Sequence, residues 1–352
     1  MELAKLLIRP LLRPISIVHW DRKFNRLVIN QRLAAVCKKT QHGTEGSWKM
    51  SEETDVLVFG SAIIDFICYT PRLPKAGETL HGHKFQTGYG GKGANQCVAA
   101  ARLGSSTALV AKLGDDSFGS DYLRQLREEN VNVSHVHQLT GHTTGIAQIA
   151  VSDGGENNII IVVGANNQLS PDDVFIAKAL FSGAKVLVCQ LETPVAATLQ
   201  ALRCFKGISI VNAAPAMEQT PPELLQLANI FCVNESEAAI MTGVSSVSSI
   251  EQANAACKRL IEMGANTVIL TLGPLGAVWG AKDSTGKFQH VPAPQVQNVV
   301  DTTGAGDAFI GALAHNLARF PERALDAHIA AACAVASQSV QLPGTQSSFP
   351  RA

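Results

Sequence analysis

A run of seven residues near the C-terminal end of the sequence, Asp301-Thr302-Thr303-Gly304-Ala305-Gly306-Asp307, combines an anion-binding turn with a carboxylate. The apolar, Ala-rich stretch Ala308 to Leu317 follows at once, so the turn should lie at the N-terminus of a helix. Small residues leave the backbone N–H groups of 304–306 uncovered where the helix concentrates positive potential, which suits a phosphate. A carboxylate beside a phosphate can take a proton from an attacking hydroxyl, which makes Asp307 a candidate general base. The alternative is a glycine turn in which Asp307 caps the helix.

A second glycine cluster, Gly88-Tyr89-Gly90-Gly91-Lys92-Gly93-Ala94-Asn95, lies far upstream. Its Gly88-x-Gly90-x-x-Gly93 spacing matches the dinucleotide-binding fingerprint, but that fingerprint must follow the first core strand. The first core strand ends instead at Gly60-Ser61-Ala62, which argues against a nicotinamide enzyme, and the chain has no Walker A motif. We expect the glycines to let the backbone approach a small polyol, with Lys92 and Asn95 as donors. The alternatives are a solvated loop cation for Lys92 and an ordinary first-turn helix residue for Asn95.

Asp65 follows the first strand in the apolar context Ile63-Ile64-Asp65-Phe66. A carboxylate there costs free energy unless it accepts hydrogen bonds, and the hydroxyls of a sugar are suitable donors. Asp65 is therefore a candidate for sugar binding, and the alternative is an Asp that caps a turn.

Short β-branched runs alternate with helical patterns from residue 55 onward, and this alternation predicts the elements that position the motifs. Continuous apolar strands between amphipathic helices are typical of a mostly parallel α/β sheet that helices cover on both faces. Ligands of such sheets bind beyond the carboxyl ends of the strands, where Glu192, Asn234 and Gly273 lie. We expect buried strands at 55–60, 108–113, 186–190, 208–212, 230–233 and 267–272, and helices at 94–103, 119–129, 171–180, 194–204 and 250–263.

Two segments, near 64–87 and 144–163, interrupt this alternation because they are rich in β-formers but lack crossover helices. A Gly154-Gly155 turn joins two of the β-rich runs in the second segment. We expect a small separate sheet that projects from the main one as a lid. Its open edge and apolar face would favour pairing with a second copy of the chain, so a homodimer through the lid is predicted.

The composition of the 352 residues excludes several classes of protein. The formal net charge is zero, so nothing favours binding to nucleic acid or to a membrane surface. No apolar run reaches the roughly 18 residues that a membrane span needs. The eight cysteines are scattered without a C-x-x-C pair, which indicates reduced thiols in an intracellular compartment rather than disulfides or a zinc site.

Residues 1–50 are basic and poor in acidic side chains, unlike the rest of the chain. They resemble an organellar transit peptide, and the competing interpretation is a leader upstream of Met50. In neither case do they belong to the fold, so the folded domain is expected at 51–352. The expected location is the cytoplasm, with the nucleus as a further compartment and the mitochondrion if residues 1–50 direct import.

The two signatures together resemble the ribokinase or phosphofructokinase-B family of carbohydrate kinases. The resemblance spans residues 55 to about 350 and rests on 88–95, extended through Arg102-Leu103-Gly104, and on 301–307. Shorter matches support it at 79–82, 164–166, 190–192, 234–237, 271–276 and 344–348. The fold that it implies is a ribokinase-like three-layer fold with a small β-sheet lid.

The resemblance implies ATP-dependent phosphorylation of D-ribose at its 5-hydroxyl, which yields ribose 5-phosphate. Asp307 would be the general base, and the amides of Gly304, Ala305 and Gly306 would form the anion hole. The positions implied for sugar binding are Asp65, Gly91, Lys92, Gly93, Asn95, Glu192 and Asp307. Those implied for ATP are Asn234, Glu237, Thr271, Leu272, Gly273, Pro274, Leu275, Gly276 and Gly306.

Two metal ions accompany the reaction in the family that the chain resembles. Glu237 would organise Mg²⁺ and phosphate through water. An activating monovalent cation, normally K⁺, would be surrounded by Asp301, Thr303, Ser339, Leu342, Gly344 and Ser348, largely through backbone carbonyls.

The chain departs from the family pattern at two places. Ile63 replaces a frequent Asn or Thr, which removes one expected hydrogen bond to the sugar, and Asn212-Ala213-Ala214-Pro215-Ala216 replaces Asn-Pro-Ala-Pro-Ala. The alternatives that stay open are another sugar or nucleoside kinase of the family, such as a fructokinase or an adenosine kinase, and a non-catalytic sugar-binding protein.

Overall fold

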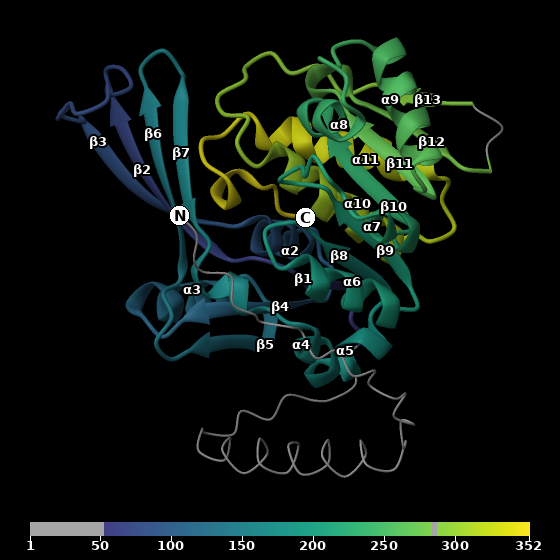
Figure 1. Ribbon diagram of the computed structural model, residues 1–352, viewed down its shortest axis with the longest axis horizontal. Helices are drawn as coiled ribbons and strands as arrows, with labels where there is room; N and C mark the ends of the chain where they lie inside the picture. Colours follow the sequence, from purple (N-terminus) through teal and green to yellow (C-terminus); the bar gives the residue numbers. More distant parts are fainter. Residues whose placement is uncertain (1–52, 284–286) are drawn as a thin grey trace, which may run out of the picture. The chain divides into compact units, whose positions relative to one another are not determined.

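The computed structural model describes residues 53–283 and 287–352 (Figure 1). The interpretations of residues 1–50 as a transit peptide or a leader lie outside these described residues. Across the described ranges, none of the helices combines the length and the apolar character that crossing a membrane would require.

A nine-stranded sheet in the order β13-β12-β11-β10-β9-β8-β1-β4-β5 forms the centre of the fold. The seven strands from β11 to β5 run parallel. At one edge of the sheet β12 pairs antiparallel with β11, and β13 pairs antiparallel with β12. The predicted mostly parallel sheet is therefore confirmed. The strands are β1 (Val56–Phe59), β4 (Thr107–Gly114), β5 (Val131–Leu139), β8 (Val186–Cys189), β9 (Ile208–Asn212), β10 (Ile230–Asn234), β11 (Thr267–Thr271), β12 (Ala277–Ala281) and β13 (Gln289–Val291).

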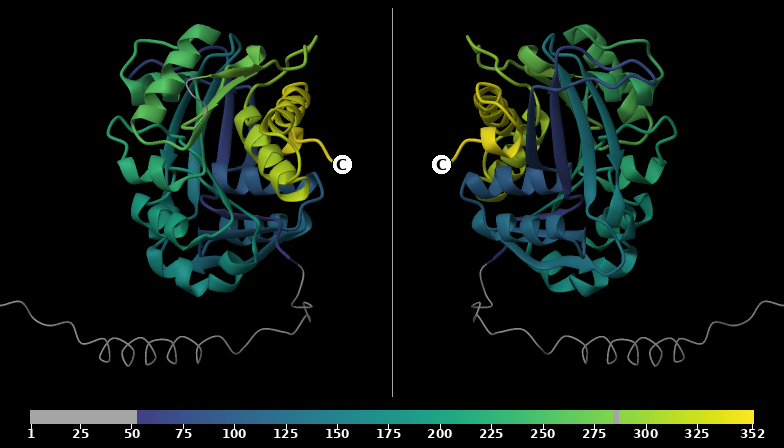
Figure 2. Two further views of the ribbon diagram at one scale, coloured as in Figure 1. Left: turned by 90° about the vertical axis from the view of Figure 1, so that its right-hand side faces the viewer. Right: turned by 90° about the vertical axis from the view of Figure 1, so that its left-hand side faces the viewer.

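Helices cover both faces of this sheet, which makes three layers (Figure 2). Side chains of β1 alternate between the two faces: Val56 and Val58 join one buried cluster, and Leu57 and Phe59 join the other. The first cluster includes α2 (Lys92–Arg102), α3 (Ser117–Glu128), α10 (Ala305–Arg319) and α11 (Leu325–Ser339). The second includes α4 (Pro171–Ile176), α5 (Lys178–Gly183), α6 (Val195–Cys204), α7 (Pro222–Leu227), α8 (Glu235–Thr242) and α9 (Ile250–Glu262).

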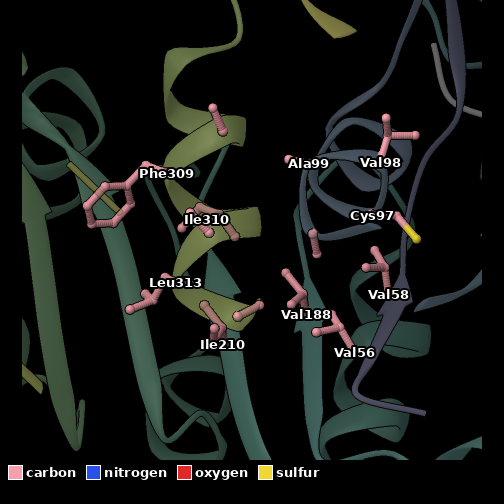
Figure 3. Packing of buried hydrophobic residues seen from close by; sticks show 14 of the residues in the cluster. Val56, Val58, Cys97, Val98, Ala99, Val188, Ile210, Phe309, Ile310 and Leu313 are labelled. Atoms are coloured by element: carbon pink, nitrogen blue, oxygen red, sulfur yellow. The ribbon is translucent and has the colours of Figure 1, made fainter. Parts of the chain in front are cut away.

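The helices α2 and α10 lie side by side on the sheet, and their apolar side chains point down onto β1, β8 and β9 (Figure 3). A glycine allows this close contact. A Cβ atom at Gly311 of α10 would lie 2.5 Å from the Cβ of Ala99 and 2.7 Å from the carbonyl oxygen of Gln96, both on α2. This seam brings the first turns of the two helices, with Asn95 and Asp307, close together.

A second sheet of four strands, in the order β3-β2-β6-β7, projects from the main body (Figure 1). It contains β2 (Ile63–Thr70), β3 (Lys84–Gly90), β6 (Gly145–Ser152) and β7 (Asn157–Val162). The predicted small separate sheet is thus confirmed. Strand β7 is exposed along its whole length, and Ile160 at 62% exposure is its most open apolar residue.

The structure also differs from the expected elements at several points. The helix expected at 171–180 is two short helices, α4 and α5, which meet at Ala177. Gly88 and Gly90 of the glycine cluster belong to strand β3. The strands β5, β12 and β13 and the helices α7, α8 and α11 were not predicted.

Candidate active site

Gly304 and the first turn of α10 form the anion-binding part of the site. Gly304 is the N-cap residue with a φ of 79°, and a Cβ atom there would lie 2.6 Å from the Cγ2 of Thr345, so a glycine is required. The Ala305 N–H donates to the carbonyl of Thr302 at 3.2 Å, whereas Gly304 and Gly306 line a cleft. The open amides of this turn are therefore those of the two glycines rather than that of Ala305.

Asp307 is buried in the first turn of α10 and is held by two amide side chains of α2. The Nδ2 of Asn95 donates to its Oδ2, and the Nε2 of Gln96 donates to its Oδ1, both at 2.9 Å. Since Gly304 is the N-cap and Asp307 caps nothing, the alternative of a capping Asp307 is wrong. The carboxylate is fixed beside the glycine turn, as a base for an alcohol bound there requires.

Glu192, just beyond the carboxyl end of β8, connects two other parts of the site. Its Oε2 accepts a hydrogen bond from the backbone N–H of Lys92 at 2.9 Å and another from the hydroxyl of Ser61. The Oγ of Ser61 accepts in turn from the N–H of Gly93 at 3.2 Å. The start of α2 is thereby tied to the ends of β1 and β8.

Asp65 lies in the middle of β2, so the alternative of a turn cap is wrong. Its carboxyl group occupies space that a glycine on β3 leaves open, because a Cβ atom at Gly90 would lie 2.3 Å from its Oδ2. Burial, together with the nearby charges of Glu192 and Asp307, raises the pKa of Asp65 to about 7.

Gly91, with a φ of 84°, and Gly93 pack against the backbone at 60–63. Chain packing is therefore a reason for these glycines that sequence reasoning missed.

Lys92 is the first residue of α2 and lines the cleft, so the alternative of a solvated loop cation is wrong. Burial acts to lower the pKa of its ammonium group. The carboxylates of Asp307, Glu192 and Glu237 outweigh burial, and the net effect is a raised pKa. Lys92 is therefore charged within a cluster of carboxylates, where it can pair with a further anion.

The cleft has a volume of about 180 Å³ and lies beyond the carboxyl ends of β9, β10 and β11. Asn234, the last residue of β10, forms a capping box with Glu237 at the start of α8: the N–H of Asn234 donates to Glu237 at 2.9 Å, and the N–H of Glu237 donates back at 2.8 Å. Burial raises the pKa of Glu237. The residues that line the cleft are Lys92, Asn212, Ala214, Cys232, Val233, Asn234, Glu237, Thr271, Gly304, Gly306, Asp307, Phe309 and Ile310.

The loop expected to contact ATP, 271–276, follows β11 and reaches the cleft only through Thr271. Its first turn is closed by the N–H of Leu272, which donates to the carbonyl of Gly276 at 2.7 Å. Leu272 and Gly276 are buried, whereas Gly273, Pro274 and Leu275 are exposed. These three residues are thus accessible to a ligand that extends beyond the cleft.

Asp301 joins the two loops that carry the residues expected around a monovalent cation. Its carboxylate accepts from the N–H of Thr303 and from the N–H of Gly344, both at 2.9 Å. Burial acts to raise the pKa of Asp301, but these hydrogen bonds outweigh it and lower the pKa. Ser339 and Ser348 are buried and Leu342 is exposed, and the N–H of Leu342 donates to the carbonyl of Ser339 at 3.3 Å.

Sequence reasoning found Asn95 but missed three other residues that hold the site in place, Gln96, Asn166 and Ser61. Gln96 adjoins the glycine cluster, and only that proximity could have pointed to it. Asn166 belongs to a short match that the sequence contained, and its side chain bonds both the N–H and the carbonyl of Ala62 at 2.9 Å. Ser61 directly follows the first strand, which is where ligand sites of parallel sheets lie.

The arrangement defines an enzyme that transfers a phosphoryl group to an alcohol: a fixed carboxylate lies beside an open glycine turn at a helix N-terminus, between a polar pocket and a cleft. Residues 53–352 match the model of a protein family described as "pfkB family carbohydrate kinase". The chain belongs to this family, which confirms the resemblance.

Individual relatives agree with this assignment. The chain is 45% identical to a ribokinase of Mus musculus over 86% of its length and 94% of the relative, and 38% identical to a deoxyribokinase of Salmonella typhi over 84% and 95%. The solved structure of an Arabidopsis thaliana ribokinase complexed with ribose and ATP is similar, with a TM-score of 0.77 and 30% identity over 85% of this chain and 96% of that one.

Proposed function

We propose that the protein transfers the γ-phosphoryl group of ATP to the 5-hydroxyl of D-ribose. The observation that carries this proposal is the Asp307 carboxylate, which Asn95 and Gln96 fix beside the turn at Gly304 and Gly306. Likeness to ribokinases supports ribose as the acceptor and ATP as the donor.

In this reaction the 5-hydroxyl oxygen attacks the γ-phosphorus, and the bond to the β–γ bridging oxygen breaks to release ADP. Asp307 takes the hydroxyl proton as the new P–O bond forms. The N–H groups of the glycine turn and the N-terminus of α10 stabilise the negative charge that develops on the transferred phosphoryl group. The carboxylates around Lys92 keep its ammonium group charged, and this charge adds positive potential near the transferred phosphoryl group.

Sugar and nucleotide occupy opposite sides of Asp307. The sugar side is formed by Asp65, Glu192 and the segment 91–95, whose Lys92 and Asn95 supply donors while the carboxylates accept from sugar hydroxyls. The nucleotide side is formed by Asn234, Glu237 and the loop 271–276.

Magnesium and a monovalent cation suit the residues present. Among the described residues no three His, Cys, Asp or Glu side chains are grouped to hold a metal. Magnesium would therefore be held mainly by the phosphates of ATP, with Glu237 contributing through water, and would neutralise phosphate charge there. Potassium suits the oxygen-only surroundings of Asp301, Thr303, Ser339, Leu342, Gly344 and Ser348, which Asp301 draws together.

The test is a coupled assay of ADP release with ribose, 2-deoxyribose, fructose and adenosine as acceptors. We expect the highest kcat/KM with ribose, and a higher value with fructose or adenosine would overturn the proposed substrate. A protein that only binds sugar would release no ADP.

Asp307→Asn tests the base in the same assay. The variant keeps the fold and ribose binding, and it loses about 10² to 10⁴ in kcat because no group accepts the proton. Normal kcat in this variant would exclude the assigned role.

A homodimer through the small sheet is part of the proposal. Strand β7 forms one end of the sheet order, and Ile159, Ile160, Ile161 and Val162 are exposed on it. A second copy would cover this apolar edge. Sedimentation should give a dimer for the wild type and a monomer for Ile160→Asp, and a wild-type monomer at micromolar concentration would contradict the assignment.

The cytoplasm is the proposed location. A fluorescent fusion of the full chain should be diffuse in the cytosol, with or without the nucleus, and import into mitochondria would contradict this.

A further inference from the structure

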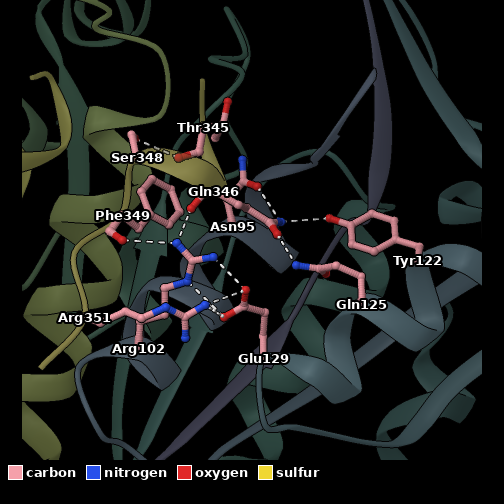
Figure 4. A network of polar contacts seen from close by, with 10 residues as sticks. All are labelled: Asn95, Arg102, Tyr122, Gln125, Glu129, Thr345, Gln346, Ser348, Phe349 and Arg351. Atoms are coloured by element: carbon pink, nitrogen blue, oxygen red, sulfur yellow. Dashed lines mark hydrogen bonds and ion pairs between the residues drawn. The ribbon is translucent and has the colours of Figure 1, made fainter. Parts of the chain in front are cut away.

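Gln346 lies at the start of the short 3₁₀ helix Gln346–Ser348, near the C-terminal end of the chain, and contacts the residue that holds the base (Figure 4). Its Nε2 donates to the Oδ1 of Asn95 at 2.9 Å and to the hydroxyl oxygen of Tyr122 at 3.1 Å. Its Oε1 accepts from the Nε2 of Gln125 at 2.9 Å. Gln346 is buried, so water does not replace these partners.

The hydrogen bonds from Tyr122 through Gln346 and Asn95 to Asp307 form a series, and the backbone carbonyl of Gly90 determines the direction of each of them. The carbonyl oxygen of Gly90 can only accept, so the hydroxyl of Tyr122 donates to it. The oxygen of Tyr122 therefore accepts, and the NH₂ group of Gln346 must face it. That NH₂ group also faces Asn95, so the amide oxygen of Asn95 points to Gln346 and its NH₂ group points to Asp307.

Gln346 and ionised Asp307 both hold Asn95 in this orientation, and without Gln346 only Asp307 would do so. An amide turned by 180° would present its oxygen to the Asp307 carboxylate, and two acceptors would then face each other. A donor to the ionised carboxylate would be replaced by a repulsive contact.

The position of Gln346 is itself fixed by charged groups. Arg102 of α2 donates to the backbone carbonyl of Gln346 and, at 3.1 Å, to that of Phe349. Arg102 also pairs with Glu129, which accepts from Arg351 at 3.0 Å (Figure 4). The C-terminal segment is thus held against the end of α2 by Arg102, while Gln346 contacts Asn95 near the start of the helix.

We propose that Gln346 is a positioning residue for the phosphoryl transfer: it fixes the amide of Asn95 so that Asn95 donates to Asp307. This rests on the proposed function, because it assigns Asp307 the role of base. Gln346 does not touch the reacting atoms and acts only through Asn95.

Other charged groups also surround Asp307 and set the background of any pH effect. Lys92 on α2 is the nearby cation, while Asp65 on β2, Glu237 on α8 and Glu192 beyond β8 are carboxylates. All four are unchanged in the variants below, so a difference between variants reports the hydrogen-bond chain.

The experiment compares Gln346→Met with the wild type in kcat, in KM for ATP and in the pH dependence of kcat/KM for ribose at fixed high potassium. Loss of the donor to Asn95 weakens the hydrogen bond that stabilises ionised Asp307. We expect kcat to fall about tenfold, the acidic limb to move up by about half to one pH unit, and KM for ATP to stay unchanged.

Two further variants separate positioning from packing. Tyr122→Phe keeps the ring but removes the hydroxyl that orients Gln346, so we expect a smaller fall in kcat and a smaller shift of the acidic limb in the same direction. This variant also provides the test if Gln346→Met does not fold. Gln125→Met removes only the bond to the Oε1 of Gln346, and its pH profile should superimpose on that of the wild type. An unmoved acidic limb in folded Gln346→Met, or the same shift in Gln125→Met, would overturn the proposal.

Failure of the proposed function would be visible separately, as absence of ribose-dependent ADP release by the wild type. The chain of hydrogen bonds can then be tested without substrate. The ¹³C carboxyl signal of Asp307, assigned with Asp307→Asn, should move in Gln346→Met because the hydrogen bond from Asn95 changes, and it should stay in place in Gln125→Met. A signal of Asp307 that is the same in Gln346→Met and in the wild type would overturn the proposal.

Discussion

Replacing Asp65 with Asn separates the stability of the protein from the affinity of its sugar pocket. Burial among carboxylates makes the ionised form of Asp65 unfavourable in the free protein and raises its pKa from 3.8 to about 7. The Asn side chain has nearly the same shape and carries no charge, so it also fits the space beside Gly90. We therefore expect Asp65→Asn to be more stable than the wild type at neutral and alkaline pH.

The magnitude follows from the two pKa values. A carboxyl group that ionises near pH 3.8 in the unfolded chain and near pH 7 in the fold destabilises the fold by up to about 4 kcal/mol at pH 8. Since the native state keeps the proton that the unfolded state has released, wild-type stability falls as the pH rises from about 4 to about 7. Below pH 4 both states are protonated, and the advantage of Asn disappears.

Urea denaturation at pH 4, 6 and 8 measures this difference directly, because titrations common to both proteins cancel in it. Asp153→Asn, which changes an exposed carboxylate just after β6 of the same sheet, is the matched control and should show no comparable gain with pH. Calorimetry with ribose should at the same time show weaker binding to Asp65→Asn, since an amide offers one acceptor instead of two. A stability difference that does not grow between pH 4 and pH 8 would refute the reasoning.

Three other substitutions test the geometry. Gly304→Ala places a side chain at positive φ and against Thr345, so it should cost about 1–2 kcal/mol in unfolding free energy and 10²-fold or more in kcat; wild-type kcat would contradict the anion turn. Glu192→Gln can keep its amide oxygen at the N–H of Lys92 and the hydroxyl of Ser61, but it replaces the other carboxylate oxygen with a donor, so KM for ribose should rise about tenfold without loss of melting temperature. Gly311→Ala pushes α10 away from α2 and should lower unfolding free energy by about 1–3 kcal/mol, measured by urea denaturation.

The parts of the fold that the sequence predicted are those in which local pattern and burial agree. Strand β9 was expected at 208–212 and is found there, because a short β-branched run in a central strand is apolar on both faces. Strand β5, at the edge of the sheet, was missed because its alternation of apolar and polar residues is interrupted where Ser134 and His135 are adjacent. Helix α8 was missed because it has only eight residues, although its Asn234 and Glu237 form a recognisable capping box.

The candidate site shows the same division between local and long-range information. Asp307 and Gly304 could be recognised because a helix N-terminus is encoded by adjacent residues. The contacts of Asp307 could not, since Asp307 lies 212 positions from Asn95 and 211 from Gln96 and meets them only because α2 and α10 pack closely. Hydrophobic periodicity predicts which face of a helix is buried, but it carries no information on the partner of a polar group within that face.

The charges of the site give a reason for the proposed requirement for cations that arrive with the nucleotide. Among the described residues that line the cleft, Lys92 is the single cation, whereas Asp307 and Glu237 are carboxylates. Asp65 and Glu192 add negative potential from the sugar side. Burial and this negative charge together raise the pKa of Asp65, and the same charge raises the pKa of Lys92 against burial. ATP alone would add to the negative charge of the site. Its polyphosphate can therefore approach Asp307 only when most of the phosphate charge is neutralised and backbone N–H dipoles stabilise the remainder. Among the described residues of the cleft, the Gly304 turn and Lys92 offer little positive potential, so most of the neutralisation would come from the proposed magnesium.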